Sequence, residues 1–375
     1  MSGWPAATAP GAWMRAVVFR EFGPPEVLGE ELIAVPVPAP GEVLVQVAAV
    51  SVGRFLDLTA RAGRHPYRGF TFPHVLGAEH AGVVAALGAD VTGLINGDRV
   101  ACFPVITDAS CEFCHAGYDE LCSSLRLVGT HQPGAYAQYV AVPARNLRRV
   151  PDQVSPVQAT GLALSGAVAM NQLLRAGFRP GQWVLVQGAA SGLGSLTAGL
   201  VRHLGGQVIG TSRSAAKRAR LAAELGVTAA LDAAGPGFAA TVRELTAGRG
   251  ADIVVDNLGD PRVWAASLAS LAPGGTLVSS GAFLGQQVQV DLSRLYLNGQ
   301  RIVGVRTGNQ ASVSALWAEV ERGFRPVLDT TFPLAKAADA HRYLEDEQNV
   351  GRVVLIVPPP VHQSGKDEPC VSADC

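Results

Sequence analysis

The chain has 375 residues, of which 48% are hydrophobic and 16% charged, and its formal net charge is −1. These values exclude a disordered or fibrous protein, and the balanced charge gives no support for nucleic-acid binding. A chain of this length is expected to form two domains, and it has no apolar run long enough to span a membrane.

The N-terminal half has the texture of strands and turns. Residues 1–15 lack the basic and apolar segments of a secretory signal, so we expect a floppy leader and a cytoplasmic protein. Short Val- and Ala-rich segments at residues 16–19, 43–49 and 80–86 predict strands, and Gly97 and Gly134 are expected to lead into further ones. This half is predicted to be a β-rich, partly open barrel.

From about Gln158, strands and helices alternate along the chain. Predicted strands at residues 183–187, 207–210, 229–231, 252–255 and 276–280 are each followed by helical or glycine-rich segments. This alternation predicts a parallel, doubly wound sheet and hence an α/β fold. Residues 301–305 are expected to form its last strand. A helix near residues 314–322 and a strand at 352–357 are expected to return to the first domain, before a disordered tail at 358–375.

A glycine-rich turn directly follows the strand at residues 183–187 and leads into a helix. Such a turn lets backbone N–H groups and a helix N-terminus approach a pyrophosphate. We therefore predict a dinucleotide site at the residues of this turn, which are Gly188, Ala189, Ala190, Ser191, Gly192, Leu193 and Gly194.

The next strand indicates which dinucleotide binds. NAD sites usually carry Asp or Glu about 20 residues after the glycines, to bind the ribose 2′-OH. Here no carboxylate is present at that strand end, while Ser212, Arg213 and Lys217 can bind a 2′-phosphate. This pattern predicts NADPH; alternatively, the two basic residues simply begin a solvated helix. Three further residues follow strand ends at the same sheet edge and are expected to contact the cofactor: Asn257, Gly281 and Phe283.

Four segments, at residues 73–84, 97–100, 134–140 and 255–259, resemble the medium-chain dehydrogenase/reductase superfamily. This superfamily includes zinc alcohol dehydrogenases and quinone or enoyl reductases. The resemblance covers roughly residues 15–357 and implies hydride transfer in a cleft between two domains. It implies a GroES-like catalytic domain at 14–151 with a structural zinc lobe at 102–124, a Rossmann domain at 152–309, and a return to the catalytic domain at 310–357.

Three of the six cysteines cluster, and in a chain without an export signal such a cluster favours a metal site over disulfides. Many members of the superfamily carry a structural zinc at Cys-x2-Cys-x2-Cys-x7-Cys. The resemblance aligns the last three ligands with cysteines of this chain and the first with an aspartate. We expect one zinc at Asp108, Cys111, Cys114 and Cys122. The alternatives are Cys102 in place of Asp108, or a metal-free lobe.

The resemblance also places the catalytic zinc ligands of zinc-dependent members on or near Gly53, Ala78 and Ser165. None of these residues is a good ligand, so we expect no catalytic zinc; a site from Asp57, Glu79 and His80 is the alternative. Reduction of an activated C=C bond (an enone or enoyl thioester) or of a quinone by NADPH is then the predicted reaction. The alternatives are a zinc alcohol dehydrogenase with unusual ligands, or a protein that binds NADPH without turnover.

The catalytic candidates lie on loops expected to face the cleft: Arg54, Asp57, Tyr67 and Glu79. Arg54 could steady an enolate, a thioester oxygen or a cofactor phosphate, or it could pair with Asp57. Tyr67 is a candidate donor or a loop aromatic. Glu79 matches a family glutamate, or it partners a buried arginine. The expected partners are a small-molecule substrate and a second copy of the chain, paired through the strand at 301–305.

Overall fold

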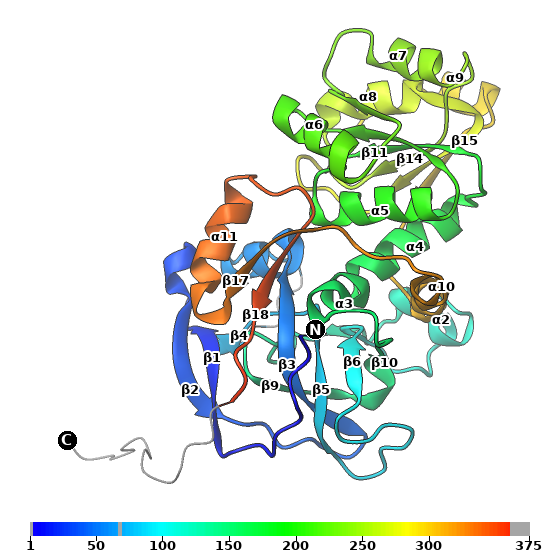
Figure 1. Ribbon diagram of the computed structural model, residues 1–375. Helices are drawn as coiled ribbons and strands as arrows, with labels where there is room; N and C mark the ends of the chain where they lie inside the picture. Colours follow the sequence, from blue (N-terminus) through cyan, green and yellow to red (C-terminus); the bar gives the residue numbers. More distant parts are fainter. Residues whose placement is uncertain (1–2, 67–69, 361–375) are drawn as a thin grey trace.

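The computed structural model describes residues 3–66 and 70–360. Figure 1 shows a strand-rich lower part and an upper part in which helices cover a sheet. The candidate Tyr67, and residues 361–375 of the expected tail, lie outside the described residues. Within the described ranges, no helix is long and apolar enough to cross a membrane.

The lower part is built around the long strand β3 (Glu42–Val52), which is buried almost throughout. It pairs antiparallel with β5 (His80–Leu87), β9 (Tyr139–Pro143) and β18 (Arg352–Ile356). The same sheet contains β6 (Arg99–Cys102), β10 (Leu147–Arg149) and β17 (Leu328–Pro333), and a smaller sheet contains β1 (Trp13–Phe19), β2 (Gly29–Ala34) and β4 (His74–Val75). The three strands predicted at residues 16–19, 43–49 and 80–86 lie within β1, β3 and β5.

Short elements fill the loops of the lower part. Two small strands, β7 (Val105–Ile106) and β8 (Arg126–Leu127), pair with each other. The helical turns are η1 (Pro25–Val27), the π-turn η2 (Arg54–Leu58), α1 (Thr59–Arg61), α2 (Glu112–His115), η3 (Asp119–Leu121), η4 (Ala144–Asn146), η5 (Leu334–Lys336) and the longer α11 (Ala337–Glu345).

The upper part contains a parallel sheet of six strands in the order β13-β12-β11-β14-β15-β16. In chain order this is 3-2-1-4-5-6, the arrangement of the Rossmann fold, so the predicted doubly wound α/β sheet is confirmed. The strands are β11 (Trp183–Gln187), β12 (Gln207–Thr211), β13 (Ala229–Leu231), β14 (Ala251–Asp256), β15 (Leu271–Ser279) and β16 (Arg301–Gly304). The helices are α5 (Gly192–His203), α6 (Ala215–Glu224), α7 (Phe238–Leu245), α8 (Pro261–Ala269) and α9 (Leu292–Leu297).

The start of β15 differs from the prediction. The strand was expected to begin at residue 276, after Pro273 and two glycines, but it begins at Leu271. Its pairing with β14 shifts register between Leu271 and Thr276, and Gly274 has a φ of 74° there. Pro273 and Gly274 are exposed, and the Pro273-Gly-Gly segment therefore interrupts the strand locally instead of preceding it.

Two helices that the sequence did not indicate join the upper and lower parts: α3 (Pro156–Ala163) and α4 (Ser165–Ala176). Six of the eight residues of α3 are buried, so its sequence lacks the alternation of polar and apolar faces that identifies a surface helix. The helix expected near residues 314–322 is α10 (Gln310–Glu321), which packs on α4 with its Leu316 side chain against Gly166. The chain then returns to the lower sheet through β17 and β18.

The expected floppy leader is wrong within residues 3–12, where the Trp4 and Thr8 side chains dock on the rest of the chain while residues 9–12 are exposed. Trp4 donates its indole N–H to the Val154 carbonyl at 3.0 Å, and Thr8 bonds to the Gln46 side chain at 2.9 Å. Proline and glycine explain the absence of regular structure in this segment. They do not prevent individual side chains from docking.

Candidate functional site

The glycine-rich turn lies where β11 ends and α5 begins, at the point where the strand order reverses. Gly188 has a φ of 65°, and a Cβ there would lie 3.0 Å from the Leu258 side chain. A Cβ on Gly194 would collide with the Gly188 carbonyl. Ser191 caps α5 by accepting the Gly194 N–H at 3.0 Å, so the preceding N–H groups at the helix N-terminus remain for an anion. The turn fits a pyrophosphate.

The predicted 2′-phosphate residues gather at the end of β12. Ser214 caps α6 through the Lys217 N–H at 3.3 Å, which places Lys217 on the first turn. Arg213 is exposed and forms an ion pair with Glu347 at 2.8 Å. Burial lowers the pKa of Lys217, and the carboxylate of Glu347 acts in the opposite direction. Glu347 is thus close to both basic residues, and no local motif indicates it because it lies over 100 residues further along the chain.

Asn257 lies at the carboxyl end of β14 and has a fixed orientation. Its Oδ1 accepts the Gln172 side-chain N–H at 2.6 Å, while its buried Nδ2 has no partner among residues 3–66 and 70–360. Gly281 lies beside it, since a Cβ there would collide with the Asn257 carbonyl. An unpaired buried donor at this sheet edge fits a polar atom of a bound dinucleotide.

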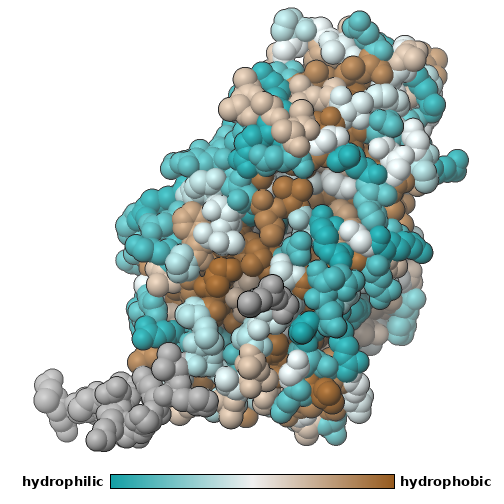
Figure 2. Space-filling model, in the orientation of Figure 1, coloured by the Kyte–Doolittle hydropathy of each residue, from teal (hydrophilic) through white to brown (hydrophobic). Residues whose placement is uncertain are grey.

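Phe283 approaches the lower part through an aromatic contact. Its ring centroid lies 5.6 Å from that of Phe55 in η2, at an interplanar angle of 84°. Both side chains are about 40% exposed. Hydrophobic residues gather where the upper and lower parts meet (Figure 2). The two rings form an apolar wall at the junction of the upper and lower parts. No sequence motif around Phe55 indicates this position.

Asp57 is buried in the π-turn that follows Gly53. Its Oδ2 accepts the Gly53 N–H at 2.7 Å and its Oδ1 accepts the Gly77 N–H at 3.0 Å. Burial raises the pKa of Asp57 to about 7, because desolvation disfavours the carboxylate more than these two N–H groups stabilise it. A Cβ on Gly53 would lie 3.3 Å from the Asp57 Oδ2. The carboxyl group therefore occupies space beside the position where the resemblance puts the first catalytic ligand.

Glu79 lies at the junction between the two parts, where both of its carboxylate oxygens are bonded. Its Oε1 accepts the Ser165 N–H at 2.7 Å, and its Oε2 forms a buried ion pair with Arg352. Arg352 in turn donates to the Ser165 hydroxyl at 2.7 Å. Both carboxylate oxygens are thus engaged, which matches the alternative in which Glu79 partners a buried arginine.

Arg54 does not pair with Asp57; its guanidinium donates to the Leu344 carbonyl at the end of α11. The alternative metal site of Asp57, Glu79 and His80 does not assemble either. Within the described ranges, the only group of His, Cys, Asp and Glu side chains with metal-ligand spacing is Asp108, Cys111, Cys114 and Cys122.

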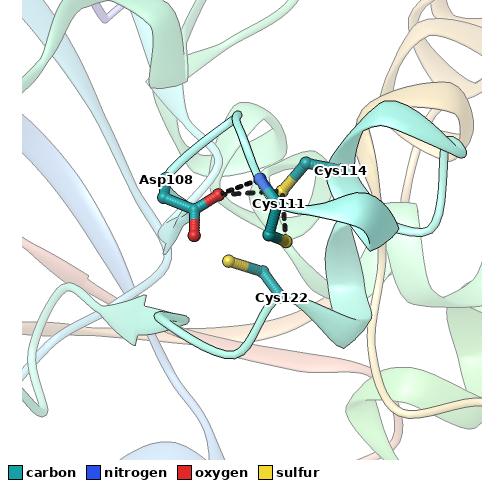
Figure 3. Close-up of side chains that lie close together, drawn as sticks. All are labelled: Asp108, Cys111, Cys114 and Cys122. Carbon is teal, nitrogen blue, oxygen red and sulfur yellow. Dashed lines mark hydrogen bonds between the residues drawn. The ribbon is translucent and has the colours of Figure 1, made fainter.

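These four side chains converge as the zinc prediction requires (Figure 3). Their ligand atoms all lie within 4.8 Å of one another, and the Cys111 and Cys114 sulfur atoms are 3.5 Å apart. Three thiols and a carboxylate around one point fit a closed tetrahedral zinc site. Cys102 is buried in β6, outside this group, so the structure brings Asp108 to the site instead.

The lobe that carries these residues also docks on the start of α10 and on α4. Asp119 accepts the Gln310 N–H at 3.1 Å, at the start of α10, and Glu120 accepts the Asn309 side chain at 2.9 Å. The Arg175 guanidinium lies 5.1 Å from the centroid of the Tyr118 ring. Cys122 directly follows this docking turn, so a metal bound there would also fix the contact with α10.

Replacing Asp108 with Ala is expected to reduce the zinc retained by the purified protein, because the fourth ligand is lost. Zinc per chain, measured by elemental mass spectrometry after dialysis against a weak chelator, checks this. The matched control is Glu112→Ala, which removes an exposed carboxylate of the same lobe that is outside the ligand group. Unchanged zinc in Asp108→Ala would remove Asp108 from the site.

Comparison with known proteins agrees with this architecture. Residues 39–152 match the alcohol dehydrogenase GroES-like domain, and residues 192–322 match the zinc-binding dehydrogenase family. The chain is 32% identical to the NAD-dependent alcohol dehydrogenase of Sulfolobus acidocaldarius, over 92% of this chain and 100% of that protein. It is also 32% identical to a 2-haloacrylate reductase from a Burkholderia species, over 92% and 98%.

A solved structure of an NAD-dependent alcohol dehydrogenase superposes on the chain with a TM-score of 0.86 at 35% identity, covering 92% of this chain and 100% of that one. The two domain matches, the relatives and the superposition agree with the segments that first indicated the resemblance. The chain belongs to the medium-chain dehydrogenase/reductase superfamily of oxidoreductases.

Proposed function

We propose that this protein is an NADPH-dependent reductase of an activated C=C bond, in an enone or enoyl thioester, or of a quinone. The observation that carries the proposal is the residue set at the three family positions for a catalytic zinc. Gly53, Ala78 and Ser165 offer no good ligand there, and the Asp57 carboxyl group lies beside the first of them. These residues do not fit a catalytic zinc. The likeness to a 2-haloacrylate reductase supports reduction of an activated double bond.

We propose that NADPH binds along the edge formed by the glycine-rich turn, the end of β12 and the end of β14. The N-terminus of α5 would receive the pyrophosphate, and Arg213 and Lys217 would pair with the 2′-phosphate. Asn257 would donate its Nδ2 hydrogens to the cofactor, with Gly281 and Phe283 beside it. When bound, the cofactor supplies a hydride.

The chain's own residues would then orient the acceptor and manage charge and protons. Reduction of a conjugated bond puts negative charge on the conjugated oxygen, which fixed donors stabilise. We propose Asp57 as the buried group that holds a proton below about pH 7. We propose that Arg54 stabilises the negative charge that develops on the substrate oxygen, or the charge of a cofactor phosphate. Glu79 is proposed to hold the upper and lower parts in position relative to each other. Tyr67 is proposed as a hydrogen-bond donor.

We further propose one structural zinc per chain in the lobe at residues 102–124, and a cytoplasmic location, where free thiol ligands persist. The domain division proposed is 14–151 for catalysis and 152–309 for the cofactor, with 310–357 returning to the catalytic domain.

A homodimer is proposed through the edge of the parallel sheet. The α9 side chains Leu292, Tyr296 and Leu297 are 69%, 71% and 72% exposed, and the edge strand β16 adds Ile302. An apolar surface beside an open strand edge suits pairing across a two-fold axis. A monomeric mass by light scattering would contradict this proposal.

The test is a turnover panel on protein with measured zinc content. NADPH oxidation is followed with enones, enoyl thioesters and quinones, and nicotinamide reduction is followed with primary alcohols. The proposal expects reduction of at least one activated acceptor, weak or no alcohol oxidation, and one zinc per chain. Two zincs with primary-alcohol turnover would support an alcohol dehydrogenase instead. Stoichiometric NADPH binding without any turnover would support a protein that only binds the cofactor.

A further inference from the structure

A carboxylate supplied by the lower part of the chain pairs with Arg213, two residues after the end of β12. Glu347 follows α11, and its carboxylate lies 2.8 Å from the Arg213 guanidinium. The segment that carries it runs along the cofactor turn, because the Gly351 N–H donates to the Ala190 carbonyl at 3.1 Å. Glu347 has a φ of 52°, which few residues other than glycine adopt, so the turn holds a specific conformation here.

We propose that Glu347 sets the cofactor specificity from the opposite domain, by competing with a 2′-phosphate for Arg213 and by accepting the 2′-OH of NADH. The inference rests on the proposed cofactor site and deepens it. The carboxylate that NAD sites carry at this strand end is missing from the strand itself, and Glu347, from elsewhere in the chain, pairs with the Arg213 side chain that directly follows the strand end.

Charge explains why one carboxylate acts on both cofactors in opposite directions. A 2′-phosphate needs the Arg213 donors that Glu347 already engages, and it would lie beside a like charge. A ribose 2′-OH carries no charge and can donate a hydrogen bond to Glu347. Arg213 and Lys217 therefore favour NADPH, Glu347 favours NADH, and the site accepts both with a modest preference.

The Arg213–Glu347 pair can be removed without endangering the fold. The two side chains are 62% and 55% exposed, and ion pairs of this exposure contribute little to stability. Changes in cofactor affinity then report on the binding site and not on unfolding.

The experiment measures the dissociation constants of NADPH and NADH on the full chain at low salt, by nicotinamide fluorescence, for the wild type and Glu347→Gln. We expect NADPH to bind more tightly and NADH more weakly, shifting the affinity ratio toward NADPH by about tenfold. The shift should shrink at about 0.5 M salt, where exposed charges are screened. Arg213→Gln should shift the ratio toward NADH by a similar factor.

The matched control is Asp346→Asn, which removes the neighbouring exposed carboxylate and should leave the ratio unchanged. An unchanged ratio in Glu347→Gln, or an equal change for both cofactors, would overturn the inference. Because only binding is measured, a failure to reduce any activated acceptor would count against the proposed reaction and not against Glu347. Likewise, a wild type that prefers NADH would correct the cofactor preference, while the shift on substitution would still support the role of Glu347.

Discussion

Replacing Glu79 with Gln is expected to lower the free energy of unfolding by about 3–5 kcal/mol, the usual cost of leaving one charge of a buried pair uncompensated. The Glu79 and Arg352 side chains are each only 4% exposed, so water cannot solvate the guanidinium that remains. Gln can still accept the Ser165 N–H, which isolates the loss of charge from the loss of that hydrogen bond. Denaturant unfolding at neutral pH measures the effect.

Two further variants show whether the lost stability comes from the unpaired buried charge. Glu31→Gln breaks the exposed pair with Arg20 and should leave the stability nearly unchanged, because water screens that pair. The double variant Glu79→Gln with Arg352→Met should recover much of the loss, because no buried charge is left unpaired. If Glu79→Gln kept its stability but lost turnover, Glu79 would act in the chemistry and not as the positioning residue proposed above.

Replacing Asp57 with Asn is expected to change how stability depends on pH. Folding raises the pKa of Asp57 from 3.8 to about 7, which corresponds to about 4 kcal/mol when the carboxyl must ionise. The unfolded chain releases this proton first, so the wild type loses stability as pH rises from about 4 to 7. The Asn side chain has no proton to lose. From pH 5 to pH 8, the free energy of unfolding of Asp57→Asn should therefore rise by about 3 kcal/mol relative to that of the wild type.

Denaturant unfolding at several pH values in this range measures the difference between the two proteins. Asp346→Asn, at an exposed carboxylate, should follow the wild type. The same variants test whether Asp57 supplies the proton for the reduction. The kcat/KM of the wild type should fall above about pH 7, and this fall should be absent from the pH profile of Asp57→Asn. Parallel stability curves for wild type and Asp57→Asn would show that Asp57 is ionised throughout and cannot hold the proton.

The fold could be predicted because its signals are local. The strand before Gly188, the glycines after it and the apolar face of the next helix all lie within a short stretch of chain. The same holds for the metal lobe, where Asp108 and three cysteines are near neighbours in sequence and meet in space. Helix α3 was missed because it is buried on nearly all sides and has no periodic pattern.

The candidate site was only partly predictable because its decisive contacts join distant segments. Glu79 meets Arg352, Arg213 meets Glu347, and Arg54 meets the Leu344 carbonyl. No local rule links residues so far apart, and each pairing follows from how β17, α11 and β18 return to the lower part. The Asp57 environment was equally hidden, because the π-turn that buries this residue leaves no signature in the sequence.

Isotope transfer tests most directly whether hydride passes from NADPH to an activated acceptor. The holoprotein is incubated with 4-deuterated NADPH of each stereochemistry and the acceptor with the highest turnover, and the product is analysed by mass spectrometry and NMR. For an enone or enoyl thioester we predict one deuterium on the β-carbon from a single face of the cofactor, with the α-hydrogen coming from solvent. A product without cofactor deuterium, or deuterium delivered only to the carbonyl carbon of an aldehyde, would contradict the proposed reduction.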